Sequence, residues 1–188
     1  MTKYLILILT FCSLSLKSIA IETVPELDLD SYKGLWHEIG SIPQSFSKDC
    51  TANAKAEYNI LESGLVQVLN SCLENDGNIN VAEGRARLNP EFNSPSKLEV
   101  TFVKFIDWIW SFSGAYWVIG LDKEYNWSVV GHPDLTYLWI LSRSPSMDLE
   151  QLYEIRRDIE AKGYDSCQVL MTKNDSNAYT GQERLCDL

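Results

Sequence analysis

The stretch TANAKAEYNILESGLVQVLNSCLENDGNINVAEGRARL, residues 51–88, contains three runs of β type separated by two turn signals. In the first run, small or apolar side chains alternate strictly with polar ones, and one face carries Ala52, Ala54, Ala56 and Tyr58. Such alternation is typical of a strand with one buried face. Residues 62–64 end in glycine, and residues 74–77 contain Asp-Gly, which is a strong hairpin signal. The stretch therefore predicts three consecutive antiparallel strands.

One later segment, residues 147–163, has a helical period instead. Its apolar side chains fall on one side of a helix at Leu149, Leu152, Ile155 and Ile159. Asp148 and Gln151 have the spacing of an N-terminal cap, and Gly163 is a natural C-terminal stop. We expect one helix here, late in the chain.

Runs of β type recur at near-regular spacing along the chain. The full set comprises residues 35–42, 51–60, 65–73, 78–88, 97–105, 115–122, 126–132 and 136–143. Eight sequential strands with mostly short loops predict an all-β fold, an eight-stranded antiparallel up-and-down barrel with the C-terminal α-helix packed on the outside. A barrel of this size has room for one small ligand. A β-sandwich is the alternative, but it usually needs long crossovers, and the spacing shows none.

The first 20 residues, MTKYLILILTFCSLSLKSIA, are typical of a secretory signal peptide, because one lysine precedes an apolar run that ends in small residues. Cys12 is not expected to carry a lipid, since the bulky Phe11 stands where lipoprotein cleavage needs a small residue. We therefore expect residues 1–20 to be a signal peptide and residues 21–188 to be a single domain. The protein would be secreted or periplasmic and not lipid-anchored.

The net charge and the cysteine content exclude some classes of partner and cofactor. Residues 1–20 contain two lysines and no acidic residue, so their removal changes the formal net charge from −10 to −12. Such a surface repels nucleic acid and anionic lipid headgroups. Four cysteines remain and predict two disulfides, whose spacing leaves three pairings open. We find no metal-ligand cluster, catalytic motif or cofactor-binding motif, so we predict no metal, no cofactor and no catalytic residue.

Three blocks carry a resemblance to a known family: GLW at residues 34–36, GLDKEY at residues 120–125 and YLWILSR at residues 137–143. They fall in order at the three signature regions of the lipocalins, so the chain resembles that family. It looks most similar to the branch containing the bacterial outer-membrane lipocalin, apolipoprotein D and the plant temperature-induced lipocalins. The resemblance implies a non-enzymatic carrier of small lipophilic molecules, such as fatty acids or lysophospholipids.

We expect the signature residues to have structural roles. We expect Trp36, which follows Gly34 in the first block, to seal the closed floor of the barrel. Arg143, at the end of the last strand, can lie over the Trp36 indole in a cation–π contact. Once Trp36 marks the floor, the loops 42–50, 73–77, 105–114 and 132–135 fall at the open mouth.

The candidate ligand site follows from strand phase together with the resemblance, which implies that the pocket is lined by Tyr58, Asn70, Phe102 and Trp139. Three aromatic walls and one amide suit a lipophilic ligand with a polar group. The alternative is that these are ordinary core residues of a filled barrel.

The stretch FIDWIWSFSGAYW, residues 105–117, is unusually aromatic. Its middle part lies in a mouth loop, where an exposed apolar patch would be formed by Ile106, Trp108, Ile109, Trp110 and Phe112. Tryptophan favours the headgroup layer of bilayers. We therefore expect this loop to contact a membrane or a lipoprotein particle. The alternative is a hydrophobic lid folded over the mouth.

The pairing of the cysteines distinguishes a carrier from an enzyme. The resemblance to apolipoprotein D-like lipocalins implies that Cys50 pairs with Cys186, which leaves Cys72 with Cys167. Were Cys72 unpaired, its phase with Asn70 would make it a cavity nucleophile, and the protein could be a lipid-converting enzyme. A third interpretation is a protein-binding lipocalin that holds its partner with the mouth loops.

Overall fold

The computed structural model describes residues 21–188, so the expected signal peptide and Cys12 lie outside the described residues. The sheet contains β1 (Gly34–Ser41), β2 (Cys50–Ile60), β3 (Val66–Glu74), β4 (Ile79–Leu88), β5 (Lys97–Thr101), β6 (Gly114–Leu121), β7 (Trp127–Gly131), β8 (Leu138–Ser142) and β9 (Leu170–Met171). The helices are α1 (Leu29–Tyr32) and α2 (Leu149–Ala161), with 3₁₀ turns η1 (Ser45–Ser47), η2 (Trp110–Phe112), η3 (Ser166–Gln168) and η4 (Leu185–Asp187).

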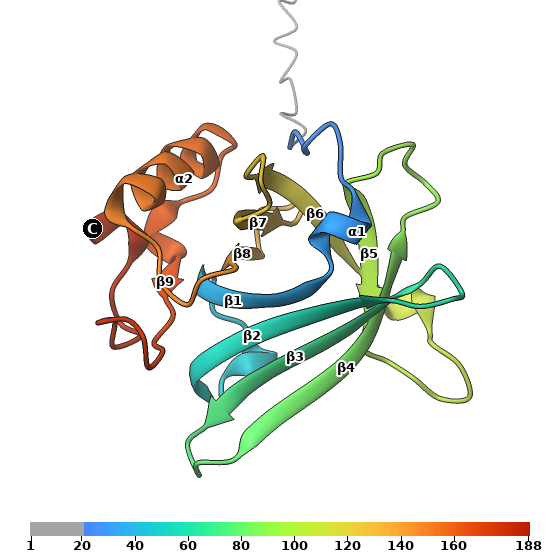
Figure 1. Ribbon diagram of the computed structural model, residues 1–188, viewed down its shortest axis with the longest axis horizontal. Coiled ribbons are helices and arrows are strands. Elements are labelled where there is room, and N and C mark those ends of the chain that lie inside the picture. Colours follow the sequence, from blue (N-terminus) through green and yellow to red (C-terminus); the bar gives the residue numbers. More distant parts are fainter. Residues whose placement is uncertain (1–20) are drawn as a thin grey trace, which may run out of the picture.

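The first eight strands form a closed barrel (Figure 1). Each strand pairs antiparallel with the next, and β1 closes the sheet by pairing with both β8 and β2. The predicted up-and-down barrel is confirmed. Only residues 34–37 of β1 pair with β2, and further along, Gly40 and Ser41 pair with the short β9. The segment around β9 therefore lies beside β1 where β2 has separated from it.

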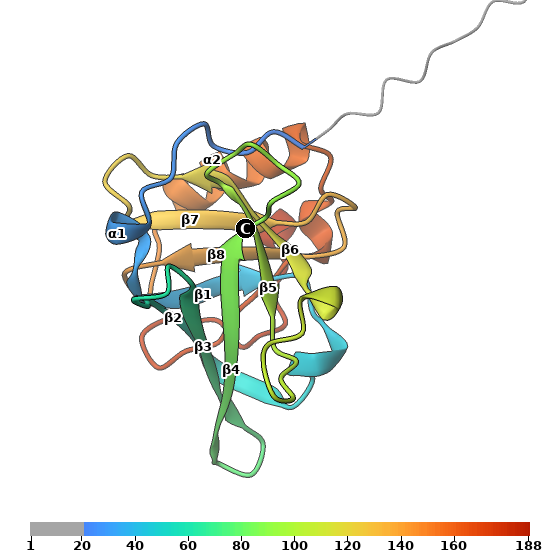
Figure 2. The same cartoon turned by 90° about the vertical axis from the view of Figure 1, so that its right-hand side faces the viewer.

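The fifth strand is shorter than predicted. The sequence pattern predicts a strand that reaches residue 105, but β5 ends at Thr101, and residues 102–113 leave the sheet before β6 begins. β5 pairs with β4 only from Arg85 onward, so the β3–β4 hairpin extends beyond its neighbours (Figure 2). Residues 79–83 are consequently exposed on both faces of the hairpin.

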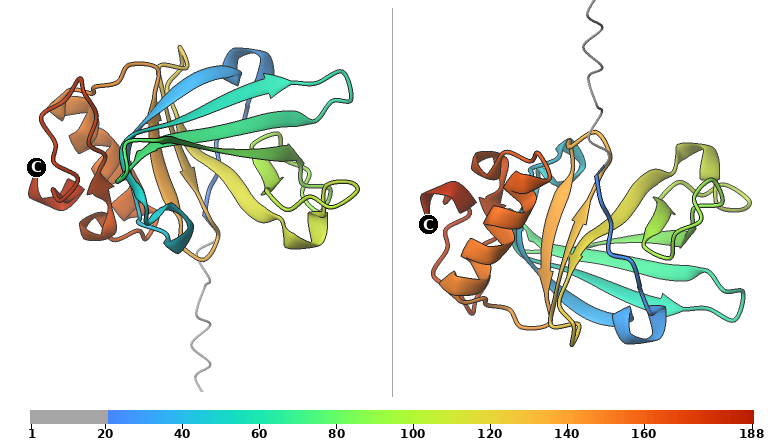
Figure 3. Two further views of the ribbon diagram at one scale, coloured as in Figure 1. Left: turned by 90° about the horizontal axis from the view of Figure 1, so that it is seen from below. Right: turned by 90° about the horizontal axis from the view of Figure 1, so that it is seen from above.

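The predicted helix packs on the outside of the barrel, on the side away from the loop of residues 102–113 (Figure 3). The Asp148 carboxylate accepts a hydrogen bond from the Gln151 N–H at 2.8 Å, and Gly163 has a φ of +97°, so both predicted ends are confirmed. Leu149 is exposed, contrary to expectation. The buried side of the helix consists of Leu152, Ile155 and Ile159, which pack against Ile39, Ile119, Val129, Leu138 and Ile140 on the outer face of the barrel. Within residues 21–188, no helix is long and apolar enough to cross a membrane.

Two disulfides are present, as predicted, but the pairing implied by the resemblance is wrong. Cys50 is bonded to Cys72 and Cys167 to Cys186. The β2–β3 hairpin places Cys50 and Cys72 on adjacent strands, with Cα atoms 5.6 Å apart. The C-terminal residues run beside α2 instead of crossing the barrel, so Cys186 in η4 meets Cys167 in η3. Two disulfides indicate an oxidising compartment, extracellular or periplasmic.

Candidate ligand-binding site

The floor of the barrel is built around Trp36, which is fully buried. Its indole Nε1 donates a hydrogen bond to the carbonyl oxygen of Tyr32 in α1 at 2.8 Å. The guanidinium carbon of Arg143 lies 3.8 Å from the centre of the Trp36 ring, so the predicted cation–π contact is confirmed.

Arg143 also ties α1 to the first strand. Its Nη2 lies 2.9–3.1 Å from the carbonyl oxygens of residues 31–33, and its Nη1 lies 2.8 Å from that of Leu35. Gly34 has a φ of +96°, and a Cβ there would lie 3.5 Å from Arg143 Nη1. A side chain at residue 34 would be strained by its backbone conformation, so glycine suits this bend.

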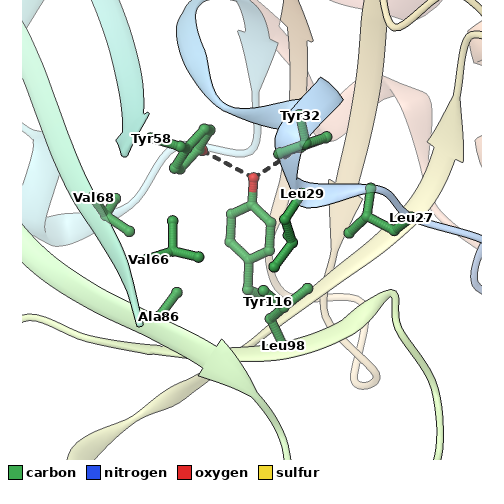
Figure 4. A pocket seen from close by; sticks show the side chains of 9 residues that line it. All are labelled: Leu27, Leu29, Tyr32, Tyr58, Val66, Val68, Ala86, Leu98 and Tyr116. Atoms are coloured by element: carbon green, nitrogen blue, oxygen red, sulfur yellow. Dashed lines mark hydrogen bonds between the residues drawn. The ribbon is translucent and has the colours of Figure 1, made fainter. Parts of the chain in front are cut away.

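Three tyrosine hydroxyls are linked by hydrogen bonds within the floor (Figure 4). The Tyr116 hydroxyl lies 2.9 Å from both the Tyr32 and the Tyr58 hydroxyls, and Tyr32 is hydrogen-bonded to Ser128 at 3.0 Å. Burial raises the pKa of Tyr32 to about 12 and also raises the pKa values of Tyr58 and Tyr116. The tyrosines therefore stay uncharged at neutral pH and act as a buried polar network in an apolar floor.

The space between these tyrosines and the neighbouring strands is small. It is an apolar cavity of about 20 Å³, enclosed with the help of Leu27, Leu29, Val66, Val68, Ala86 and Leu98. A water molecule needs roughly 10–15 Å³ of such space, so a lipid cannot fit there. The floor half of the barrel is thus filled by its own side chains.

The mouth half of the barrel is open. Asn70 pairs with Ala56, a buried interior residue, so Asn70 faces inward, yet it is exposed. Gly114 pairs with the inward-facing Val100, and a Cβ added at Gly114 would meet no atom within 4 Å. At this end of the barrel, inward-facing positions are exposed, whereas those in the floor are buried.

Two more of the predicted lining residues, in addition to Asn70, flank this open half. The Phe102 ring covers Gly84 on the inner wall so closely that a Cβ at residue 84 would lie 2.8 Å from it, and Phe102 is still 43% exposed. Trp139 packs against the interior cluster and stacks on Tyr137, with ring centroids 5.8 Å apart. Of the four predicted residues, Tyr58 belongs to the filled floor, while Asn70, Phe102 and Trp139 surround the open half. Their contact with a ligand stays a prediction.

One interior residue was missed by the sequence analysis. Glu38 pairs with Leu141, an interior residue, and Ser41 pairs with Trp139, so Glu38 and Ser41 share the inner face of β1. Burial raises the pKa of the Glu38 carboxyl, although hydrogen bonds from Thr172 and Ser41 partly oppose this. The available signal was the phase of β1, because a residue two positions after an inward-facing tryptophan also faces inward.

The predicted membrane loop is only partly exposed. Trp108 lies over the Arg85 guanidinium at 4.7 Å and Trp110 over that of Arg87 at 4.0 Å, because the loop folds back along the outer wall of β4. Both tryptophans and Ile109 are half-buried, contrary to the expected exposed patch. The exposed apolar side chains of the loop are Phe105, Ile106 and Phe112. The loop covers the wall of the barrel and not its mouth.

A closed eight-stranded barrel with a sealed floor and an interior open at the other end defines a class of small-molecule-binding barrels. A family model described as a lipocalin-like domain matches residues 27–174. The chain belongs to the lipocalin family.

Known relatives agree with this assignment. Temperature-induced lipocalin-1 of Arabidopsis thaliana is 33% identical over 147 residues, which cover 77% of this chain and 78% of the plant protein. Apolipoprotein D of Rattus norvegicus is 31% identical over 159 residues, which cover 80% of this chain and 78% of the rat protein. Among solved structures, insecticyanin of the tobacco hornworm Manduca sexta has a TM-score of 0.65 at 21% identity and covers 86% of this chain and 87% of that one. This last similarity concerns the fold alone.

Proposed function

We propose that this lipocalin carries a small lipophilic molecule in the open half of its barrel. The observation that carries the proposal is the contrast between a filled floor and inward-facing residues that are exposed above it. Phe102 and Trp139 would supply apolar walls on either side, and Asn70 a neutral hydrogen-bonding group. Burial of apolar ligand surface would drive binding at roughly 25 cal/mol per Å².

We propose no catalytic role for the protein. The alternative of a lipid-converting enzyme required Cys72 as a free nucleophile, and the Cys72 sulfur is bonded to Cys50. A disulfide sulfur offers no thiolate for covalent catalysis. The disulfides also support the proposed location of the carrier outside the cytosol, where the expected signal peptide would direct it.

We also propose that the carrier exchanges its ligand while touching a membrane. Phe105 and Ile106 lie at the tip of a short hairpin in which Lys104 pairs with Trp108, and they are 83% and 88% exposed. Large apolar side chains exposed to this degree at the end of a loop are typical of contact sites. A net negative chain would favour neutral lipid over anionic lipid.

The pocket assignment is tested with a fluorescent lipophilic probe and the variant Phe102→Asp, which puts an unpaired charge beside the open interior. We expect the probe to bind the wild-type protein and to lose most of its affinity for this variant. Leu35→Asp is the matched control, because Leu35 is 45% exposed but shares the outer face of β1 and β2 with Glu57. Equal affinity in all three proteins would contradict the assignment. Failure of the wild type to bind any lipophilic probe would favour the protein-binding interpretation.

A further inference from the structure

On β1, the inner wall of the barrel carries a carboxylate whose position is set by strand register. Glu38 lies two residues beyond Trp36 on β1, opposite Leu141 of β8, so it sits one layer above the floor. It is buried enough to be desolvated but keeps part of its surface accessible. By register, Glu38 lies between the filled floor and the layer of Ser41 and Trp139 in the open half of the barrel.

The hydrogen bonds of this carboxylate are incomplete. Its Oε1 accepts from the Ser41 hydroxyl at 2.8 Å and from the Thr172 hydroxyl at 2.6 Å. Both donors are neutral and both reach the same oxygen. Across residues 21–188, no lysine, arginine or histidine nitrogen forms an ion pair with Glu38 within 4.0 Å. A desolvated carboxylate without a counter-ion is costly, and a cation supplied from outside would remove that cost.

The surroundings of Glu38 favour one kind of ligand. The neighbouring interior side chains on β8 are Leu141 and Trp139, which add no charge, and an indole face also attracts cations. The pKa of Tyr58 is raised chiefly by burial and also by the charge of Glu38, so Tyr58 stays neutral and supplies no charge to the site. A carboxylate head would be repelled by Glu38, an alcohol would gain one neutral hydrogen bond, and an ammonium would gain a charge-assisted one.

We propose that Glu38 is the counter-ion for the protonated amine of a lipophilic amine, and that this carrier selects amines over fatty acids. The inference rests on the proposed carrier function. The amine would reach down to Glu38, and its apolar part would lie between Phe102 and Trp139 with its far end toward the mouth. The net negative charge of the chain would raise the local concentration of such cations.

The test compares three ligands of equal chain length: decylamine, decanol and decanoic acid. Binding is measured by calorimetry at pH 7.4, below the concentration at which any of them forms micelles. The wild-type protein is expected to bind decylamine at least about tenfold more tightly than decanol, and decanoic acid more weakly than decanol. The wild-type series alone tests the inference, so it does not depend on whether a variant folds.

Two variants then locate the effect. Glu38→Gln keeps an oxygen that can accept from Ser41 and Thr172 but removes the charge, so the preference for decylamine should disappear while decanol still binds. Glu57→Gln removes the same charge from the exposed outer face of β2, and it should keep the wild-type preference. A thermal melt of each variant reports whether it is folded.

The outcomes separate the two proposals. If decanol and decanoic acid bind but decylamine is not preferred, or if Glu38→Gln keeps the preference, the inference about Glu38 is wrong and the carrier function stands. If none of the three ligands binds the folded wild-type protein, both proposals are wrong.

Discussion

At the scale of single residues, the floor of the barrel depends on Trp36 and on the Arg143 guanidinium, which lies 3.8 Å from the centre of its ring. The contact between Trp36 and Arg143 could be predicted because it depends on signature positions. The hydrogen bonds from Arg143 to the carbonyls at the end of α1 could not, since α1 has only four residues and no periodic signal. Glu38 was missed for a different reason. Its inward direction follows from alternation. Its two hydrogen-bond donors are neutral, and one of them, Thr172, is distant in the sequence.

Glu38 also has a consequence for stability that differs from that of most carboxylates. Its pKa is raised in the folded protein above its unfolded value, chiefly by burial. Between those two pKa values the folded state binds more protons than the unfolded state, so stability falls as pH rises through this window. Each unit of pKa difference corresponds to about 1.4 kcal/mol. The contribution of Glu38 is therefore fully present below its unfolded pKa and is lost above its folded one.

We predict that Glu38→Gln changes the free energy of unfolding little at pH 4 and increases it relative to the wild type as pH rises toward 8. Urea unfolding at several pH values, without ligand, measures this difference. Glu57→Gln should give a curve that stays parallel to the wild type, because Glu57 is exposed on the outer face. A Glu38→Gln curve that also runs parallel to the wild type would show that the carboxyl is well hydrated.

At the scale of elements, alternation predicted all eight barrel strands, and a 3.6-residue period with two end signals predicted α2. The predicted strand boundaries are wrong where a β-type pattern continues along the chain but the neighbouring strand to pair with does not. Residues 102–105 keep a β composition, yet the chain leaves the sheet after Thr101. The loop then returns along β4, where Arg85 and Arg87 provide cationic surfaces for its tryptophans. Nothing in the loop's own sequence identifies those distant arginines.

This contact leads to a prediction about the loop. Trp110→Ser removes a half-buried indole that stacks on Arg87 at 4.0 Å, and we expect it to lower the free energy of unfolding by about 1–2 kcal/mol. Phe112→Ser, two residues away, removes an exposed ring and should change stability by no more than about 0.5 kcal/mol. Urea unfolding of both variants makes the comparison. Equally small changes in the free energy of unfolding for both variants would mean that packing of the loop on β4 adds little to stability.

At the scale of the whole molecule, the two ends of the barrel are built for different tasks. The floor end is filled and is tied to α1 through Arg143. The mouth end is open, and the long β3–β4 hairpin extends beyond β5 on one side of it (Figure 2). A carrier of lipophilic molecules needs this asymmetry, because the ligand must enter at one end without opening the core at the other.

We expect the exposed apolar residues of the loop to be needed for membrane binding by the mouth end. We predict that the triple variant Phe105→Ser, Ile106→Ser and Phe112→Ser binds neutral phosphatidylcholine vesicles much more weakly than the wild type in a flotation assay. Three exposed apolar side chains are lost, while the tryptophans that hold the loop to β4 are untouched. Added salt should change wild-type binding little, since apolar contacts are not screened as charges are.

The matched control removes as many exposed apolar side chains from other surfaces, at Leu35, Leu88 and Leu149, each roughly half exposed. This variant should bind vesicles as the wild type does, because its substitutions lie on the outer face of β1, at the floor end of β4 and on α2. An equal loss of binding in both variants would mean that general surface hydrophobicity, and not the loop, determines adsorption. Unchanged vesicle binding by the loop variant would contradict the proposed membrane contact of the loop, and the carrier would then exchange its ligand through water.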